Sequence, residues 1–236
     1  HNNNNNNNNA DTQQQQQQQP LPPYMVSLVG IPGGGKSISS LLLATFLEAE
    51  DDNNNHNVII NGSNSSAAGG VMIMPHDGYH YPMDQLRLMP DAADVIYRRG
   101  APDTFDPSAL KRDLERIRYG PEEWITVPGF DHGRGDPEPD QHAFDRNHHK
   151  VVICEGLYLL HDSDGWEDVA TMFDMSIFIE SDVDACVERL KVRNLCIPGY
   201  TPEEIQLRCE QVDRVNANTV MKSKYRASEV VESIAA

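Results

Sequence analysis

The chain has 236 residues, of which 39% are hydrophobic and 23% charged, and its formal net charge at pH 7 is -17. This length suffices for one substantial hydrophobic core. The negative charge repels phosphate backbones and disfavours general nucleic-acid binding, although local donors and magnesium can still hold a nucleotide at one site. No run approaches the roughly 18 apolar residues of a membrane span, so no membrane partner is expected.

The cysteines are spread along the chain without a C-x-x-C pair. This usage favours a reducing compartment and argues against a zinc ribbon or a disulfide scaffold. We therefore expect a cytoplasmic location. The sequence begins with His1 and not with methionine, which leaves an upstream targeting segment open. The four cysteines are Cys154, Cys186, Cys196 and Cys209.

Low-complexity sequence occupies two parts of the chain. Residues 1–19 consist mostly of asparagine and glutamine tracts, which cannot bury apolar surface, so residues 1–20 are predicted to be disordered. Polar residues of the same character fill about 51–70. They predict an insertion in a surface loop, since the entropic cost of closing a loop grows slowly with its length. Residues 21–236 are otherwise predicted to form a single domain.

Segments of strand length alternate with segments of helical periodicity. "YMVSLVG" (24–30) is typical of a strand, and residues 36–50 have apolar positions at helical spacing. Asp106 and Pro107 are typical of a helix N-cap and a first helical position. This alternation predicts an α/β fold with a central, mainly parallel sheet. Further strands are predicted at 71–74, 124–130, 150–156, 173–180 and 228–234, and further helices from about Asp182 and Thr201.

The stretch "GIPGGGKS" matches G-x-x-x-x-G-K-[ST] between a predicted strand and a predicted helix. Its glycines let backbone N–H groups approach phosphate oxygens, and the helix amino end adds favourable potential. Lys36 is expected to reach the β- and γ-phosphates and Ser37 to bind magnesium. The alternative is a glycine-rich turn without a ligand, which this context disfavours. The predicted phosphate-binding residues are Gly30, Ile31, Pro32, Gly33, Gly34, Gly35, Lys36, Ser37 and Ile38.

Three classes of protein use such a loop: switch GTPases, ATPases that do mechanical or assembly work, and small-molecule kinases. The chain has no N-K-x-D segment for guanine recognition, which weighs against the first class. A kinase needs a carboxylate near the acceptor hydroxyl and an acidic group near magnesium. Asp77, after "VMIMPH", suits the first role, and Glu155, near the end of "VVICEG", suits the second. Neighbouring parallel strands would bring both to one crevice.

Several further segments resemble one family of kinases in the family's order. They are "PHDGYHYP", "RRGAPDTFDPSAL", "VPGFDHGRGDPEPD", "VVICEGLYLL" and "CVERLKVRN". Together with the phosphate loop they resemble the P-loop kinases related to uridine kinase, phosphoribulokinase and bacterial-type pantothenate kinase. The resemblance is greatest to a uridine-kinase-like branch that includes fructose-transport-system kinases. It implies a three-layer P-loop NTPase sandwich with a helical lid.

The resemblance also implies roles for single residues. Asp77 matches the general base, Glu155 the acidic residue beside magnesium, and Asp131 with His132 the substrate-side loop. The lid-helix arginines are matched by Arg189 and Arg193. Their i,i+4 spacing independently places both guanidinium groups on one helical face, where arginine suits phosphate oxygens.

Some positions depart from the family or have ordinary structural interpretations. Ile38 stands where many relatives have a second hydroxyl residue. Met83 stands where relatives often have an arginine, which leaves two alternatives: a different acceptor, or Arg87 in place of that arginine. A strand-end Asp or Glu can be a cap, and lid arginines can form surface ion pairs. A zinc pair at His76 and His80 is disfavoured because the segment is not expected to be helical. His80 and Tyr81 instead are candidates to line the acceptor pocket. The pair His148–His149 is interpreted as a solvated loop.

The sequence therefore predicts a kinase that uses ATP and Mg²⁺ to phosphorylate a hydroxyl group of a nucleoside, sugar or related metabolite. The catalytic residues would be Asp77, Lys36, Arg189 and Arg193. The alternative is a nucleotide-dependent binding or assembly protein that phosphorylates no metabolite. The identity of the acceptor is not predicted, and a homodimer, common among relatives, is left open.

Overall fold

The computed structural model describes residues 21–54, 70–197 and 199–233. The predicted disordered tract, and residues 55–69 of the predicted insertion, lie outside these residues. The centre of the molecule is a five-stranded sheet of order β2-β5-β1-β6-β7 in which all neighbouring strands are parallel. The mainly parallel sheet is therefore confirmed. Its strands are β1 (Tyr24–Gly30), β2 (Val71–Pro75), β5 (Val151–Gly156), β6 (Met175–Glu180) and β7 (Glu229–Glu232).

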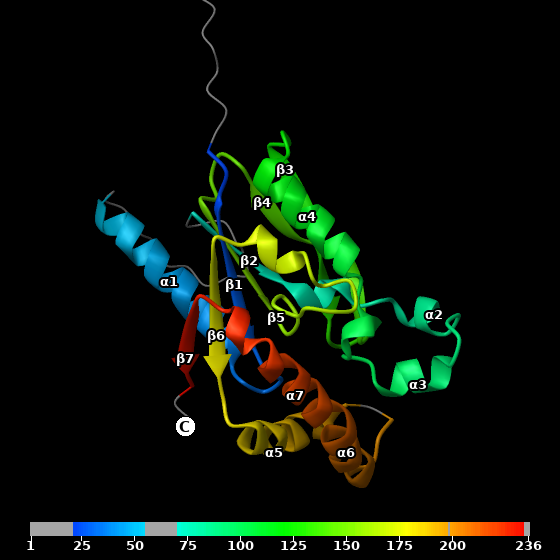
Figure 1. The fold of residues 1–236 in the computed structure, drawn as a ribbon. Coiled ribbons are helices and arrows are strands. Elements are labelled where there is room, and N and C mark those ends of the chain that lie inside the picture. Colours follow the sequence, from blue (N-terminus) through cyan, green and yellow to red (C-terminus); the bar gives the residue numbers. More distant parts are fainter. Residues whose placement is uncertain (1–20, 55–69, 198, 234–236) are drawn as a thin grey trace, which may run out of the picture.

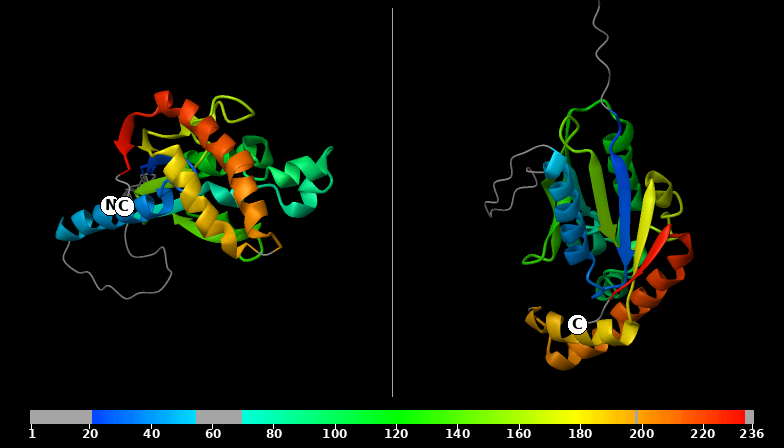
Figure 2. Two further views of the ribbon diagram at one scale, coloured as in Figure 1. Left: turned by 90° about the horizontal axis from the view of Figure 1, so that it is seen from below. Right: turned by 90° about the vertical axis from the view of Figure 1, so that its left-hand side faces the viewer.

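Helices cover both faces of the sheet, which gives the predicted three layers (Figures 1 and 2). On one face, Val26 and Leu28 of β1 pack in a cluster with Ala44 of α1 (Lys36–Asn54). The alternate residues Met25 and Val29 face the larger core with side chains of α4 (Pro107–Tyr119) and α7 (Arg214–Lys222). Because β1 is apolar on both faces, its sequence is a nearly continuous hydrophobic run.

A helical subdomain follows β6 and lies beyond the carboxyl ends of the strands (Figure 1). It consists of α5 (Val183–Arg193), α6 (Pro202–Arg208) and a π-helical turn, η5 (Cys209–Asp213), that leads into α7. Asp182 caps α5 by accepting from the backbone N–H of Ala185, and Thr201 and Glu204 form a capping box at α6. Both predicted helix starts are thus confirmed, and we call this unit the lid.

The segment predicted as a strand at 124–130 is a strand, but it does not join the parallel sheet. It forms β3 (Trp124–Asp131), which pairs antiparallel with β4 (Asp136–Asp145) in a separate hairpin. The sequence does not predict β4 because two prolines and several acidic residues interrupt it. The hairpin buries Ile125, Val127 and Phe144 in the larger core.

Short helical segments connect these elements. None of the helices in the described residues is long and apolar enough to cross a membrane. The remaining segments are α2 (Met83–Leu86), α3 (Ala92–Tyr97), η1 (His76–Tyr79), η2 (Pro102–Thr104), η3 (Val169–Met172), η4 (Asn194–Cys196) and η6 (Lys224–Arg226).

The structure differs from the sequence interpretation at three further places. Helix α1 continues to Asn54, four residues into the segment interpreted as an insertion. His149 is buried and its Nδ1 accepts from the backbone N–H of Asp145, so this histidine is not part of a solvated loop. The segment that begins at His76 is not predicted to be helical, but it forms the 3₁₀ turn η1.

Candidate active site

The carboxyl ends of β1, β5 and β2 bring the phosphate loop, Glu155 and Asp77 to one edge of the sheet. Glu155 lies opposite Leu28 of β1 on one side and opposite Pro75 of β2 on the other. β1 ends at Gly30, where the phosphate loop begins, and Asp77 follows the last residue of β2 by two positions. Sheet order alone therefore places these three groups side by side.

The phosphate loop turns tightly between β6 and the lid. Gly33 and Gly35 have φ of 74° and 84°, in the left-handed region that glycine adopts without strain. A Cβ atom on Gly33 would lie 3.0 Å from the carbonyl oxygen of Cys186 in α5, and one on Gly34 would lie 3.1 Å from Ser181 Oγ. The loop thus leaves little room for side chains. Ile31 is fully buried and anchors it to the core.

Lys36, the first residue of α1, lies among the charged groups of the site. Its Nζ donates to the Ile31 carbonyl at 3.2 Å, across the loop. Burial lowers the pKa of Lys36, the negative charges of Glu155 and Asp77 act to raise it, and the charge of Arg193 lowers it further. Lys36, Asp77, Glu155 and Arg193 are therefore close enough to interact electrostatically, and we call them the charged cluster.

Ser37 and Glu155 place two oxygen-bearing side chains next to each other beside the loop. Ser37 Oγ donates to Glu155 Oε1 at 3.0 Å, and Glu155 is 8% exposed. Mg²⁺ is usually held through one or two protein oxygens together with substrate phosphates and water. A carboxylate and a hydroxyl group next to a phosphate cradle fit this requirement.

A cavity next to the phosphate loop has one buried polar group directed toward it. Ser181 Oγ is buried next to Gly34 and has no hydrogen-bond partner among the described residues. Ser181 lines a cavity of about 450 Å³ that extends from the end of β6 to Met221 of α7 and to Glu232 of β7. Since buried hydroxyl groups normally have a partner, this unpaired oxygen fits a polar group of a ligand that reaches from the loop into the cavity.

Asp77 lies in η1, immediately after β2. Its Oδ1 is 3.0 Å from Nδ1 of His76, and 43% of its side chain is exposed. Desolvation raises the pKa of Asp77, but the hydrogen bond from His76 and attraction to positive charge nearby, including that of Lys36, outweigh it and lower the pKa. The carboxylate is therefore ionised at neutral pH and open to solvent on one side.

His80 lies beside Asp77 and contacts its backbone. Its Nδ1 is 2.8 Å from the Asp77 carbonyl oxygen, and its ring centroid is 3.9 Å from that of Phe105. Burial lowers the pKa of His80 to about 4, so the ring is neutral at pH 7. A carbonyl oxygen can only accept, so Nδ1 carries the proton and Nε2 remains an acceptor.

Tyr81 follows His80 at the mouth of a second cavity. The cavity, of about 350 Å³, lies between the 78–82 segment, α4 and the β3–β4 hairpin. Burial and the nearby charge of Asp106 raise the pKa of Tyr81, so its phenol stays protonated. Arg99 Nη2 donates to the Tyr81 carbonyl at 3.1 Å and to Asp136 at 2.8 Å, which ties this segment to the hairpin.

The tip of the hairpin contacts the 77–81 segment, which we call the acceptor loop after its predicted role, through the aromatic ring of Phe130. Phe130 lies 4.9 Å from His80 and 5.2 Å from His132, between ring centroids. The carboxylate of Asp131 instead accepts from the backbone N–H groups of Gly133 and Arg134 and from the Arg134 guanidinium. Of the two predicted substrate residues on this hairpin, His132 is exposed next to Phe130, whereas Asp131 is engaged in its own turn.

The two lid arginines differ in their surroundings. Arg189 Nη2 donates to Cys186 Sγ at 3.1 Å, one turn back along α5. Arg193, at the end of α5, donates to Asn194 Oδ1 at 3.3 Å, and its charge acts on Lys36. The structure therefore brings Arg193 to the charged cluster and leaves Arg189 bound to its own helix.

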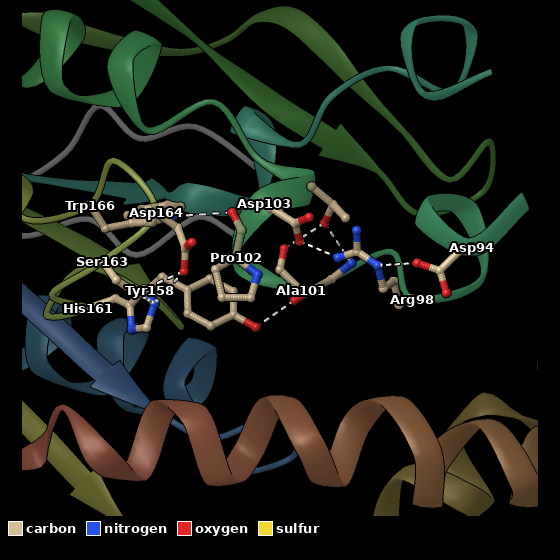
Figure 3. A network of polar contacts seen from close by, with 12 residues as sticks. Asp94, Arg98, Ala101, Pro102, Asp103, Tyr158, His161, Ser163, Asp164 and Trp166 are labelled. Carbon is tan, nitrogen blue, oxygen red and sulfur yellow. Dashed lines mark hydrogen bonds and ion pairs between the residues drawn. The ribbon is translucent and has the colours of Figure 1, made fainter. Parts of the chain in front are cut away.

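The aromatic core behind the site is tied to the 98–103 segment (Figure 3). Tyr158 donates to the Gly100 carbonyl at 2.6 Å, and Trp166 Nε1 donates to the Pro102 carbonyl at 3.2 Å. Arg98 bridges Asp94 and Asp103 on the same segment. These contacts fix the positions of Tyr158 and Trp166, whose rings lie next to those of His76 and Phe105.

A serine, a histidine and an aspartate also meet in the loop at the left of Figure 3. Ser163 Oγ and Asp164 Oδ2 lie 2.8 Å and 3.2 Å from the same atom, Nε2 of His161. A hydrolytic triad needs the serine and the acid on opposite ring nitrogens. This group therefore closes a loop and does not form a nucleophile.

Sequence reasoning assigns no role to three residues that the structure places at the site. They are the buried His76, the ring of Phe130 and the unpaired Ser181 hydroxyl. Only His76 carries a signal in the sequence, its position next to Asp77, and zinc binding is the one role considered for it there. The other two depend on contacts between segments far apart in the chain.

Comparison with known proteins identifies the family. Residues 89–235 match the model of the phosphoribulokinase/uridine kinase family. The chain belongs to this family. It is also 36% identical over 160 residues to an ATP-dependent kinase-like protein of Aspergillus versicolor, an alignment that covers 66% of this chain and 92% of that protein.

Solved structures agree with this membership. A protein from Silicibacter described as a fructose transport system kinase has 26% identity and a TM-score of 0.73, with 92% of both chains covered. Phosphoribulokinase from Rhodobacter has 13% identity and a TM-score of 0.58 over 91% of this chain and 71% of its own, and it shows the fold alone. The P-loop kinase fold predicted from the sequence is thus confirmed.

Proposed function

We propose that the protein is an ATP-dependent kinase that transfers the γ-phosphoryl group to a hydroxyl group of a nucleoside, sugar or related metabolite. The observation that carries this proposal is the position of Asp77. It is an ionised, half-exposed carboxylate within electrostatic range of Lys36, at the strand end two strands away from the phosphate loop. A protein that only binds a nucleotide has no need for such a group.

The residues of the site divide the work of phosphoryl transfer. When bound, Mg²⁺ supplies charge neutralisation at the phosphate oxygens, and Ser37 and Glu155 would hold it. Asp77 would orient the acceptor hydroxyl and take its proton. Lys36 and Arg193 would stabilise negative charge on the transferring group. Closure of the lid would exclude water and limit hydrolysis of ATP.

The acceptor would bind between the 77–81 segment and the tip of the β3–β4 hairpin. Neutral His80 offers a hydrogen-bond acceptor at Nε2, and Phe130 and His132 offer ring surfaces. Asp131 would contribute by shaping the turn that presents His132, since its carboxylate is already bonded. Arg99 lies beneath Phe130 and is held by the hairpin.

The test is transfer of labelled γ-phosphate from MgATP to a pooled panel of nucleosides, sugars and hydroxy acids. We expect a labelled product, and separating the pool would identify the acceptor. The Asp77→Asn variant, confirmed to bind ATP, would run in parallel. ATP binding without any labelled product across a broad panel would contradict the proposal and favour a nucleotide-dependent binding protein.

A further inference from the structure

We propose that His76 is a positioning residue that holds the carboxylate of Asp77 in place with a proton fixed on Nδ1. The inference rests on the proposed function, because it assigns a task to His76 in phosphoryl transfer. It does not assign His76 a contact with substrate, since the ring is 1% exposed and lies behind Asp77.

The contacts of the ring determine where its proton lies. His76 Nδ1 is 3.0 Å from Asp77 Oδ1, and His76 Nε2 is 3.4 Å from the backbone nitrogen of Leu157. A backbone N–H group can only donate, so Nε2 accepts and the neutral ring carries its proton on Nδ1. That proton points to the carboxylate. The imidazole thus connects the base after β2 to the backbone after β5.

Packing against neighbouring rings and the backbone fixes the position of the His76 ring. It stacks on Phe105 with centroids 4.7 Å apart and planes 22° apart, and Tyr158 and Trp166 lie 6.2 Å and 6.0 Å away (Figure 3 shows the latter two). A Cβ atom on Gly156 would lie 2.5 Å from Cγ of His76, so the glycine after Glu155 leaves the space that the ring fills.

This arrangement gives the two oxygens of Asp77 different tasks. Oδ1 accepts the hydrogen bond from His76 Nδ1–H, whereas no donor within the described residues reaches Oδ2, and 43% of the Asp77 side chain is exposed. Oδ2 is therefore the oxygen left to the acceptor hydroxyl. A fixed Oδ1 sets the direction of Oδ2, and a misplacement of about 1 Å can cost roughly 100-fold in rate.

Three substitutions separate positioning from packing. The amide of His76→Asn places an N–H donor where Nδ1 lies, and that of His76→Gln places one nearer the Nε2 position. The side chain of His76→Leu fills the space of the ring but has no N–H donor at either position. With the acceptor found in the panel, we expect His76→Leu and His76→Gln to lower kcat about 10- to 100-fold without raising KM for ATP. We expect His76→Asn to stay within about threefold of the unmutated rate.

A purely structural role predicts a different pattern. The three variants would then lose activity in proportion to their loss of thermal stability, and His76→Asn would not recover kcat selectively. Equal kcat in His76→Leu and the unmutated kinase would also overturn the inference.

A second readout does not depend on kinase activity. Long-range ¹H–¹⁵N spectra of the histidine rings, assigned by comparison with His76→Asn, distinguish an Nδ1 proton from an Nε2 proton. We expect the Nδ1 form for His76 in the unmutated protein, and the Nε2 form would overturn the inference. If the panel gave no product, the proposed function and the catalytic task of His76 would both fail, while an Nδ1 proton would show that the contact itself is correct.

Discussion

At the scale of single residues, burial and neighbouring charges have opposite effects on the pKa values of Lys36 and Asp77. Burial lowers the pKa of Lys36, yet two carboxylates act to keep it protonated, and Asp77 is ionised in spite of its desolvation. A bound triphosphate would add negative charge beside Lys36 and favour its charged form. ATP binding should therefore be linked to protonation of this lysine.

This linkage predicts how ATP affinity depends on pH. The affinity should fall as the pH rises through the lowered pKa of Lys36, before the ordinary lysine value of 10.5 is reached. Calorimetric titration of ATP at a series of pH values below 10.5 measures it. An arginine stays charged in this range, so Lys36→Arg should give a flatter profile even if it binds more weakly. Parallel profiles for the two proteins would contradict the linkage.

At the scale of elements, the lid meets the phosphate loop through α5. The carbonyl of Cys186 would contact a Cβ atom on Gly33, and Arg193 at the end of the helix acts on Lys36. Arg189 is directed to Cys186 one turn earlier. Helical spacing predicts that both arginines share a face, but it does not determine which one reaches the site.

The lid arginines should therefore differ in their effect on catalysis. We expect Arg193→Gln to lower kcat by about 10³-fold, in the range of arginines that stabilise a transferring phosphoryl group. Arg189→Gln should cost much less, because its guanidinium is engaged elsewhere. Steady-state kinetics with saturating ATP compare the two. A larger loss in Arg189→Gln would show that the lid closes in an orientation that brings Arg189, and not Arg193, to the phosphates.

The β3–β4 hairpin packs on the acceptor loop at Gly78. A Cβ atom there would lie 2.4 Å from the Pro128 carbonyl oxygen. Gly78→Ala should therefore push η1 from β3, destabilise the protein by about 1–3 kcal/mol and impair transfer. Gly70→Ala is a matched control, since its nearest contact would be an ordinary 3.5 Å. Urea unfolding of both variants tests the expectation, and equal midpoints would contradict it.

At the scale of the whole molecule, the sequence predicts the strand–helix alternation and the parallel sheet because apolar runs and caps carry local signals. The caps at Asp106, Asp182 and Thr201 are examples. The hairpin strand β4 is not predicted because Pro137 and Pro139 are residues that the sequence pattern of a strand normally excludes. The place of Ser181 at the site depends on contacts between distant segments, and so do the contacts of His76 with Phe105 and Leu157, although His76 stands next to Asp77 in the sequence.

The pH dependence of stability is a property of the whole fold to which His80 contributes. The pKa of His80 is about 4 in the folded protein, whereas the ordinary histidine value, which applies to the unfolded chain, is 6.5. Between these values the unfolded state binds more protons, so the stabilising contribution is present above about pH 6.5 and is lost as the pH falls toward 4. The loss is at most about 3.5 kcal/mol, since one pKa unit corresponds to about 1.4 kcal/mol.

The variant His80→Phe keeps a ring and removes this titration. We expect the free energy of unfolding of the unmutated protein to fall relative to that of the variant between about pH 6.5 and pH 4. Both proteins have the same formal net charge at pH 7, -17 with histidine neutral. The titration of all other groups therefore contributes about equally to both, and the difference between them reports on His80. Urea unfolding at several pH values measures the difference, and a difference that did not change with pH would contradict a buried neutral His80.

The central claim is that Asp77 serves an acceptor hydroxyl beside the phosphate loop. Single-turnover transfer of labelled γ-phosphate to the identified acceptor by the Asp77→Asn variant tests it most directly, with ATP affinity measured on the same preparation. We predict that ATP affinity stays within a few-fold, because Asp77 is not a phosphate ligand, and that the transfer rate falls by about 10²- to 10⁴-fold. An unchanged transfer rate in a folded, ATP-binding variant would contradict the claim.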